Sequence, residues 1–331
     1  MTKPSIITFN NDKANEGIPS RGALFFIIRS ILTSTTRKVF TNMEITKYLL
    51  FADVAETKNF TRSGDNMGYT QPGVSHILKS MENEIGFPLF IRTRQGIELT
   101  SNAEVILPIV RRMLSINEQL EQTIASLNGL EIGHLTIASF ASTSRIWLPK
   151  VINKFQRTYP GIEIELLEGG TDDIVGWINN NYADFGLVSR RHTENLEWIK
   201  IADDPLVAVL PEGFVDDDDE IFPISNMHNQ PFIIPAEGTD YDVHFALEDS
   251  GVVPDERFSS KDDSAIVSMV ANNLGLSILP ELVVMGNDFK FKSLPLDPPY
   301  KRELGIAYRA DNSLSPAAKH FIEILQEMIC A

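Results

Sequence analysis

The sequence predicts an α/β protein in two parts, a small helical part followed by a larger part in which strands and helices alternate. The chain has 331 residues, of which 43% are hydrophobic, so it can bury a substantial core and has room for about two domains. Apolar residues recur at helical spacing from residue 49 to residue 127. From Gly133 onward, strand-like and helix-like segments follow one another. The α/β class follows from these three observations.

The first part contains two short helices joined by a tight turn. We expect Thr61 to cap the first helix and Gly68 to end it, because glycine readily adopts the left-handed conformation found there. Thr70 then caps the second helix, Pro72 fits its first turn, and Gly86 ends it. The second helix carries one apolar stripe at helical period, formed by Val74, Ile77, Leu78, Met81 and Ile85. Two such helices with a glycine-containing turn form a helix-turn-helix.

The opposite face of the second helix carries polar side chains suited to DNA. Glutamine pairs with adenine through two hydrogen bonds, serine contacts base or phosphate, and lysine neutralises phosphate. The N–H groups at the helix start favour phosphate, and the glycine in that turn allows close approach to the groove. Residues 89–100 predict two short strands turning at Gln95–Gly96, a wing whose arginines reach phosphates or a minor groove. The predicted DNA contacts are Thr70, Gln71, Pro72, Gly73, Ser75, His76, Lys79, Arg92 and Arg94. For His76, simple exposure remains an alternative.

A long amphipathic helix follows the wing. Ser101 to Glu104 has the spacing of a capping box at its start, and Pro108 should kink the helix or loosen the preceding turn. The apolar stripe has no core of its own to join, so we expect it to pair with the same helix of another subunit. Packing on its own domain is the alternative. The predicted dimerisation residues are Ile106, Ile109, Met113, Ile116, Leu120 and Ile124, and the expected outward residues are Arg111, Arg112, Glu118 and Glu121.

The segment from Met43 to Glu104 resembles the winged helix-turn-helix of LysR-type transcriptional regulators. The matching residues are Phe51, Asn59-Phe60, Thr70 to Ser75, Met81 to Gly86, Leu89 to Arg92 and Leu99-Thr100. Ser63-Gly64 and Asn102-Ala103 depart from the family pattern of two alanines and of Ala-Gly. The resemblance implies a sequence-specific regulator of transcription that binds double-stranded DNA and forms a homodimer or homotetramer through its linker helix.

The C-terminal part predicts a two-lobed α/β domain. Its first half has the order βαβαβ of a parallel sheet, with strands at 134–139, 162–167 and 183–189 and helices at 144–159 and 171–180. A similar unit follows, with strands at 206–210 and 232–235 and helices at 239–247 and 264–274, the last closed by Gly275. A strand at 304–308 and a helix at 315–329 then complete the first half. The chain therefore crosses between lobes near 203–205 and near Glu303, which makes a hinged cleft.

This domain is similar to the LysR-family effector domain, which is built like a periplasmic binding protein. The matching landmarks are Leu148-Pro149, Phe155, Tyr159-Pro160, Ala183 to Gly186, Gly275 and Leu279-Pro280. The resemblance implies that a small-molecule effector binds between the lobes. The expected domain limits are 43–102 for the winged helix-turn-helix, 103–130 for the linker helix and 131–331 for the effector-binding domain, with lobe I at 131–203 and 304–331 and lobe II at 204–303.

Ligands of such sheets bind where strands end and helices begin. The hydroxyl groups and free helix N–H groups expected there suit a carboxylate or another small polar effector. Serine and threonine are also ordinary helix caps, which remains the alternative for each residue alone. The predicted effector contacts are Ser139, Ser142, Thr143, Thr171, Ser189, Glu237 and Thr239, with Arg190 beside Ser189.

Charge is distributed unevenly along the chain. The formal net charge is −16, but residues 43–102 carry only −1, whereas 15 basic residues face 33 acidic ones from residue 131 onward. Because the field at a binding face depends on local charge placement, the acidity of the C-terminal part does not exclude DNA binding by the first part.

Other functional classes lack supporting patterns. No run of eighteen apolar residues indicates a membrane span, so we expect a cytoplasmic protein without a membrane partner. Asp184-Phe185-Gly186 lacks the other kinase motifs, Asp216 to Glu220 lacks EF-hand spacing, and Cys330 is the only cysteine. We therefore expect no cofactor, no metal site and no enzymatic activity. The alternatives are a small-molecule-binding protein without regulatory output, and an enzyme that uses the two-lobed domain.

Residues 1–42 match nothing in the family. They carry a charge of +4, and Met43 falls where such regulators commonly begin. We hypothesise that Met43 is the true start. The alternative is a basic arm that touches DNA or membrane.

Overall fold

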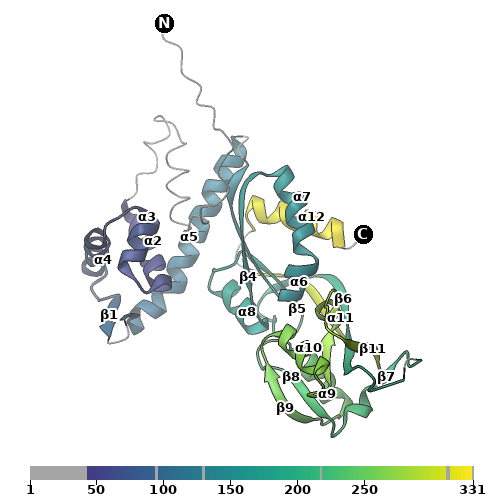
Figure 1. Cartoon of the computed structure of the whole chain (residues 1–331). Coiled ribbons are helices and arrows are strands. Elements are labelled where there is room, and N and C mark those ends of the chain that lie inside the picture. Colours follow the sequence, from purple (N-terminus) through teal and green to yellow (C-terminus); the bar gives the residue numbers. More distant parts are fainter. Residues whose placement is uncertain (1–42, 94–95, 129–130, 217, 311–313, 330–331) are drawn as a thin grey trace, which may run out of the picture. The chain divides into compact units, whose positions relative to one another are not determined.

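The computed structural model describes residues 43–93, 96–128, 131–216, 218–310 and 314–329, and it divides into two compact units after Val110. Our expectations about residues 1–42, Arg94 and Cys330 lie outside the described residues. Figure 1 labels helices and strands of both units.

The first unit is a winged helix-turn-helix. Its elements are α2 (Met43–Thr57), α3 (Phe60–Met67), α4 (Gln71–Ile85), β1 (Phe90–Thr93), β2 (Gly96–Leu99) and the start of α5 (Ser101–Leu127). The strands β1 and β2 pair antiparallel, with Thr93 opposite Gly96. A small core holds the helices together and consists of Leu50, Phe51, Val54, Met67, Val74, Leu78, Met81 and Leu89. The predicted order of helices and wing is confirmed.

Two predicted helix caps are wrong by one or two residues. Asn59, not Thr61, caps α3, because its side-chain oxygen accepts from the N–H groups of Thr61 (2.9 Å) and Arg62 (3.2 Å). At the start of α5, Thr100 accepts from the N–H of Ala103 at 3.1 Å, in place of the expected capping box from Ser101. Asparagine and threonine are both common helix caps, as are the residues that we predicted. Which of several neighbouring residues caps the helix depends on where the helix begins, and the sequence pattern does not fix this to a single residue.

The second unit contains one sheet that extends through both lobes. The lobe I strands are β3 (Ile132–Ser139), β4 (Gly161–Glu168), β5 (Phe185–Ser189) and parts of β6 (Glu197–Pro211) and β12 (Lys301–Tyr308), in the order β4-β3-β5-β12-β6. As predicted, β3 pairs parallel with β4 and β5. The helices α7 (Leu148–Thr158) and α12 (Pro316–Ile329) share one core with β3, and α8 (Thr171–Asn179) belongs to a second core.

The predicted helix 144–159 is two helices. In its place stand α6 (Ala141–Ile146) and α7, with Trp147 between them. Pro149 lies in the first turn of α7 and has no N–H to continue the hydrogen bonds of α6, so the chain starts a new helix there. The pattern of apolar residues alone did not reveal this break.

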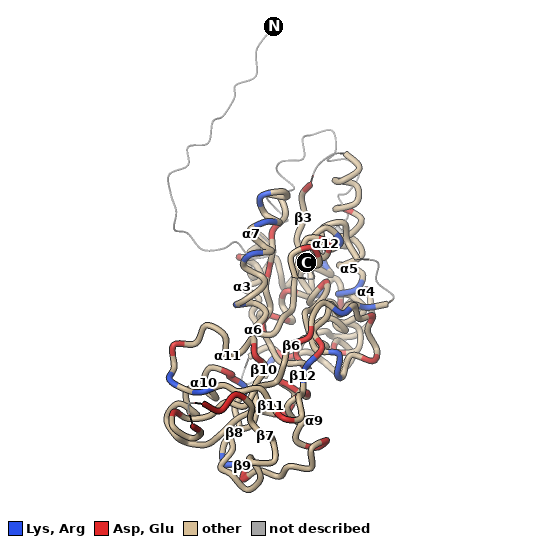
Figure 2. The backbone as a smooth tube through the Cα atoms, turned by 90° about the vertical axis from the view of Figure 1, so that its right-hand side faces the viewer, with Lys and Arg blue, Asp and Glu red and all other residues tan. Residues whose placement is uncertain are grey.

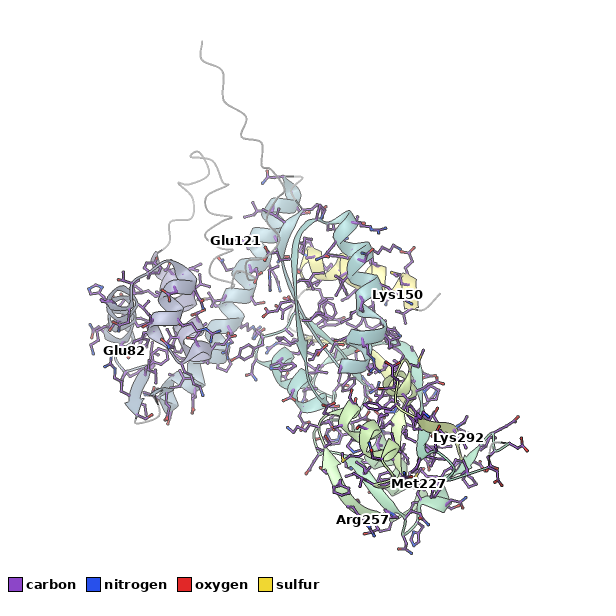
Figure 3. All side chains as sticks on the ribbon, in the orientation of Figure 1. Glu82, Glu121, Lys150, Met227, Arg257 and Lys292 are labelled. Atoms are coloured by element: carbon purple, nitrogen blue, oxygen red, sulfur yellow. The ribbon has the colours of Figure 1, made fainter. Side chains whose placement is uncertain are left out.

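Lobe II is formed around the second half of β6. Its strands are β7 (Phe222–Pro223), β8 (Pro231–Pro235), β9 (Asp255–Ser260), β10 (Ser277–Pro280) and β11 (Phe291–Asp297), and its helices are η2 (Ile224–Met227), α9 (Tyr241–Ser250), α10 (Asp263–Ala271) and α11 (Glu281–Val284). Figure 3 labels Met227, which is fully buried in this lobe. The helix α10 ends at Asn272, not at Gly275, and a Cβ on Gly275 would lie 2.7 Å from the Pro231 oxygen. Gly275 is therefore required for close packing on β8.

Two strands cross between the lobes, as the sequence predicts. Residues 202–205 of β6 pair antiparallel with residues 301–304 of β12, and from Leu206 onward β6 pairs with β10 and β11 instead. The two crossing segments are hydrogen-bonded to each other, so they form a paired hinge at the base of the cleft.

Candidate functional site

The recognition helix α4 is fixed at both ends and on one face. Thr70 Oγ1 accepts from the Gly73 N–H at 3.3 Å, and Gly86 ends the helix with a φ of 86°. The side chains of Val74, Leu78 and Met81 are buried. The helix therefore presents a fixed outer face.

The predicted DNA contacts on α4 lie on that outer face. His76, Lys79 and Pro72 are exposed, and Gln71, Gly73 and Ser75 are half-exposed. Lys79 Nζ lies 3.8 Å from Glu82 Oε2, yet 72% of the Lys79 side chain is exposed, so its ammonium group remains accessible to a phosphate. Carboxylates on the same helix, at Glu82 and Glu84, limit the positive potential of this face.

The turn before α4 depends on two glycines. Gly68 has a φ of 73°, which is the left-handed conformation expected at the end of α3. Gly64 is buried, and a Cβ on it would lie 2.5 Å from the Tyr69 oxygen. An alanine at residue 64, the residue that the family pattern has there, would push this turn away from α3.

The wing carries one described arginine. Arg92 lies on β1 opposite Ile97 and is exposed, whereas Arg94 lies outside the described residues. Thr93 Oγ1 donates to Glu98 Oε1 across the two strands at 2.9 Å. A cavity of about 190 Å³ lies nearby, lined by Val54 and Phe90 among others, and it contains none of the predicted contacts.

The linker helix α5 leaves its apolar stripe at the surface. The exposed fraction is 66% for Ile109, 51% for Ile116 and 49% for Leu120, with Met113 and Ile124 also exposed and Ile106 half-buried. An uncovered stripe of this length is unusual for an isolated chain and indicates a partner surface.

The polar face of α5 packs on lobe I. Arg111 was expected on the outside, but its guanidinium carbon lies 3.6 Å from the ring centroid of Tyr182. Farther along, Gln122 Nε2 donates to the His134 oxygen at 2.9 Å, and Gln122 is buried. Glu121, labelled in Figure 3, has a pKa raised by burial, although the Asn117 amide opposes this. The helix therefore packs on lobe I through Arg111 and Gln122, whereas the predicted stripe residues Ile109, Met113, Ile116, Leu120 and Ile124 stay exposed.

The two lobes contact each other directly at the start of α8. The N–H groups of Thr171 and Asp172 donate to the carbonyl oxygens of Thr239 (3.0 Å) and Gly238 (3.1 Å). Thr171 Oγ1 donates to the same Thr239 oxygen at 3.0 Å, and the Tyr241 hydroxyl donates to the Asp172 carboxylate at 3.0 Å. The helix N–H groups that we expected to be free for an effector are thus occupied by lobe II.

Arg302 lies on β12 where the two strands cross between the lobes, and it was not among the predicted residues. It is 2% exposed, and its Nε donates to Asp204 Oδ2 at 2.8 Å. Its Nη1 donates to Asp240 Oδ2 at 3.2 Å, and its Nη2 donates to Ser142 Oγ at 2.8 Å. Although burial lowers the pKa of Arg302, the carboxylates of Asp204, Asp240 and Asp263 raise it overall. One guanidinium therefore joins lobe I, the crossing strand β6 and the start of α9.

Burial raises the pKa of Asp204 despite the opposing charge of Arg302, and two further carboxyl groups in this region also have raised pKa values. Asp242 accepts from Ser189 Oγ and from Arg191 Nε at 2.7 Å, yet burial, together with Asp240, raises its pKa to about 6. Burial also raises the pKa of Asp263 to about 6, with Asp240 adding to this shift and Arg302 opposing it. Both pKa shifts have the same main cause, because burial disfavours the charged form of each carboxyl group.

The predicted effector residues divide into four sets. Ser142 and Ser189 belong to the buried network around Arg302 and Asp242, and Thr171 and Thr239 form the contact between lobes. The hydroxyls of Ser139 and Thr143 bond to each other behind this network. Glu237 is exposed on the loop before α9. The prediction missed Asp204 and Arg302. Their signal in the sequence is that each is a charged residue at one of the two predicted crossings between the lobes.

Figure 2 shows acidic and basic residues along the backbone of both units. Among the described residues, no group of three or more histidine, cysteine, aspartate or glutamate side chains is arranged to hold a metal ion. No helix in the described ranges is long and apolar enough to cross a membrane.

Two protein-family models match this chain. The model described as the bacterial regulatory helix-turn-helix protein, lysR family, matches residues 45–104. The model described as the LysR substrate binding domain matches residues 128–329. The HTH-type transcriptional regulator YvbU of Bacillus subtilis (strain 168) is 30% identical over 292 residues, which cover 87% of this chain and 100% of YvbU.

Solved structures share the fold. Full-length OxyR from Pseudomonas aeruginosa aligns with a TM-score of 0.69 at 20% identity, over 88% of this chain and 95% of OxyR. Full-length CbnR, solved in complex with its target DNA, aligns with a TM-score of 0.61 at 20% identity, over 86% of this chain and 99% of CbnR.

Proposed function

Because this chain belongs to the LysR family of transcriptional regulators, we propose that its outward α4 residues and its wing contact DNA and that an effector acts at the Arg302 cleft. The family assignment makes the chain a DNA-binding regulator of transcription with an effector-binding domain. The proposal adds which residues carry each role.

The DNA contacts are assigned to Thr70, Gln71, Pro72, Gly73, Ser75, His76 and Lys79 on α4 and to Arg92 and Arg94 on the wing. Their support is the fixed outer face of α4, whose inner face is fully used by the core. Gln71 is the residue that reads a base, and Arg92 neutralises a phosphate. CbnR, a structural neighbour, was solved on its target DNA, which supports the same mode of use here.

The dimer is assigned to the exposed stripe of α5, at Ile106, Ile109, Met113, Ile116, Leu120 and Ile124. Two copies bring two recognition helices to one DNA molecule, and successive major grooves lie roughly 34–36 Å apart. Dimerisation therefore doubles the contacts to phosphate. It offsets the weak positive charge of a single α4 face.

The effector is assigned to the cleft residues Ser139, Ser142, Thr143, Thr171, Ser189, Glu237 and Thr239, to which we add Arg302 and Asp242. All of them except Glu237 and Thr239 are buried, so an effector that engages them must move the lobes apart or replace contacts between them. This domain binds an effector and does not convert it chemically.

The protein works in the cytoplasm, where DNA is found. We also propose the domain limits 43–102, 103–130 and 131–331.

One observation supports the DNA-binding and dimerisation roles together. The helix α4 has a fixed polar outer face, and the following helix α5 has an exposed apolar stripe. The test is to incubate the purified full chain with fragmented DNA of its source genome at near-physiological salt and to sequence the retained fragments. Enrichment of a few sites sharing an interrupted inverted repeat is the expected result. Uniform retention, or none, by a folded dimer would contradict it and favour a small-molecule-binding protein without regulatory output.

A further inference from the structure

The short helix α8 contacts lobe II at its first residues, and Tyr182, three residues beyond its last one, contacts the linker helix α5. Its first N–H groups, from Thr171 and Asp172, are bonded to lobe II. At its other end, the Tyr182 N–H donates to the Trp177 oxygen at 2.8 Å, which ties Tyr182 to the last turn of α8. The Tyr182 ring in turn lies under the guanidinium of Arg111 on α5. One helix thus connects the seam between the lobes with the linker helix.

The helix α8 is built to move as one body. Its nine residues span about 13 Å at 1.5 Å per residue. Ile174 and Ile178 are fully buried against lobe I, and Arg309 Nη1 donates to the Asn179 oxygen at 2.6 Å. Packed helices move by sliding of about 1–2 Å rather than by bending. A displacement at the start of α8 therefore reaches Tyr182.

The linker helix α5 has a second anchor on lobe I, away from α8. Gln122 bonds the His134 oxygen and packs so tightly on Gly133 that a Cβ there would lie 2.8 Å from Gln122 Cδ. This anchor is eleven residues after Arg111 and so about 16 Å along the helix. It rests near the start of β3, beside β4. A shift of Tyr182 therefore tilts α5 about the Gln122 anchor, and α5 runs unbroken from Ser101 to Leu127.

We propose that Tyr182 and Arg111 are positioning residues that transmit closure of the lobes from α8 to the linker helix. This inference rests on the proposed function, in which an effector acts between the lobes and the linker helix sets the geometry of the dimer. The stacked guanidinium suits the role because it keeps a fixed orientation over an aromatic ring. An isolated lysine would hold no such orientation.

Gly170 offers a way to open the lobes without an effector. A Cβ at this residue would lie 2.6 Å from the Gly238 oxygen and 2.6 Å from Thr239 Cα. Its φ of −79° and ψ of −179° are open to alanine, so Gly170→Ala acts as a wedge between the lobes without straining its own backbone. Gly176→Ala is the matched control. Gly176 lies on the same helix, α8, and a Cβ on it would meet no atom within 4 Å.

The test is a double-mutant cycle read by hydrogen exchange and mass spectrometry on the full-length protein. Gly170→Ala should speed exchange at residues 171–172 by at least about tenfold, through local opening, and should also speed exchange in residues 111–127. Gly176→Ala should do neither. In a Tyr182→Ala background, Gly170→Ala should still open the start of α8 but should no longer change residues 111–127. Tyr182→Phe keeps the ring and should retain the coupling.

Two results would overturn the inference. One is an equal response of residues 111–127 to the wedge with and without the Tyr182 ring, since the coupling would then follow another route. The other is unchanged exchange at residues 171–172 in Gly170→Ala, since the lobes would then not be closed in solution. A failure of the proposed function would be seen in the DNA-retention experiment and not in hydrogen exchange. In that case no genomic site would be enriched, while the four exchange measurements would still give the expected pattern.

Discussion

The recognition helix and the cleft between the lobes place their polar side chains in opposite ways. On α4, the polar side chains come from one short segment and face solvent, so they need no partner within the chain. In the cleft, the buried polar groups come from β6, β12, α6 and the start of α9, and they bond to one another. A buried charge is costly unless it is paired and hydrogen-bonded, whereas an exposed one is stabilised by water. The cleft should therefore tolerate substitution far less than α4 does.

The largest effect is expected for Arg302→Ala. Removing this guanidinium leaves Asp204 and Asp240 buried without their countercharge, which should destabilise the second unit by about 3–5 kcal/mol in urea unfolding. Lys200→Ala is the control, because Lys200 bonds Glu303 on β12 and Asp203 on its own strand β6, but at the surface. Its unfolding midpoint should stay near that of the wild type. Equal losses for the two variants would remove the distinction between the buried and exposed pairs.

A smaller effect, dependent on pH, is expected for Asp263→Asn. The pKa of about 6 in the folded protein exceeds the unfolded value of about 3.9, so the folded state holds the proton more tightly. The stability that Asp263 contributes is therefore present in full below about pH 4 and is lost as the pH rises through about 6.

Asp263→Asn should consequently stabilise the second unit by about 1–3 kcal/mol at pH 7 and by little at pH 4, as measured by unfolding at several pH values. Asp288→Asn, at an exposed position, is the control and should change neither value. A gain that is the same at pH 4 and pH 7 would show that the substitution acts through packing instead of charge.

On α4, Gln71→Ala should cost about 1–3 kcal/mol for one base pair of the binding site and leave protein stability unchanged. The measurement is competition binding with single-base variants of a selected site. Asn83→Ala, at an exposed position farther along the same helix, is the control and should leave every variant unaffected. If Gln71→Ala weakened all site variants alike, the glutamine would be positioning the helix on the backbone and not recognising a base.

The smallest effect is expected for Arg92→Ala on the wing. Loss of one phosphate contact should weaken binding to all sequences by a similar factor and reduce the slope of log affinity against log salt by about one. Titrations at several salt concentrations measure this slope. An unchanged slope would place Arg92 away from the DNA backbone.

The sequence predicted the winged unit closely because its determinants are local. A glycine at residue 68, a cap at Thr70 and a stripe of period 3.6 fix the turn and the inner face of α4 without reference to distant residues. The errors there were shifts of one or two residues in the caps of α3 and α5, since several neighbouring residues have capping side chains. In the second unit, the parallel pairing of the first three strands and the two crossings were also predicted, because alternation of strands and helices is a local pattern.

The network around Arg302 was not predictable in the same way. Arg302 and Asp204 are 98 residues apart and meet only because β6 and β12 pair at the hinge. Likewise, Arg111 has the spacing of an outward residue on α5, and only the position of Tyr182 turns it into a contact. The sequence by itself therefore determined which face of α4 is polar and which stripe of α5 is apolar, since helical period decides both. The tertiary structure alone decided which charges are buried and paired, because pairing depends on distances between segments that no local pattern specifies.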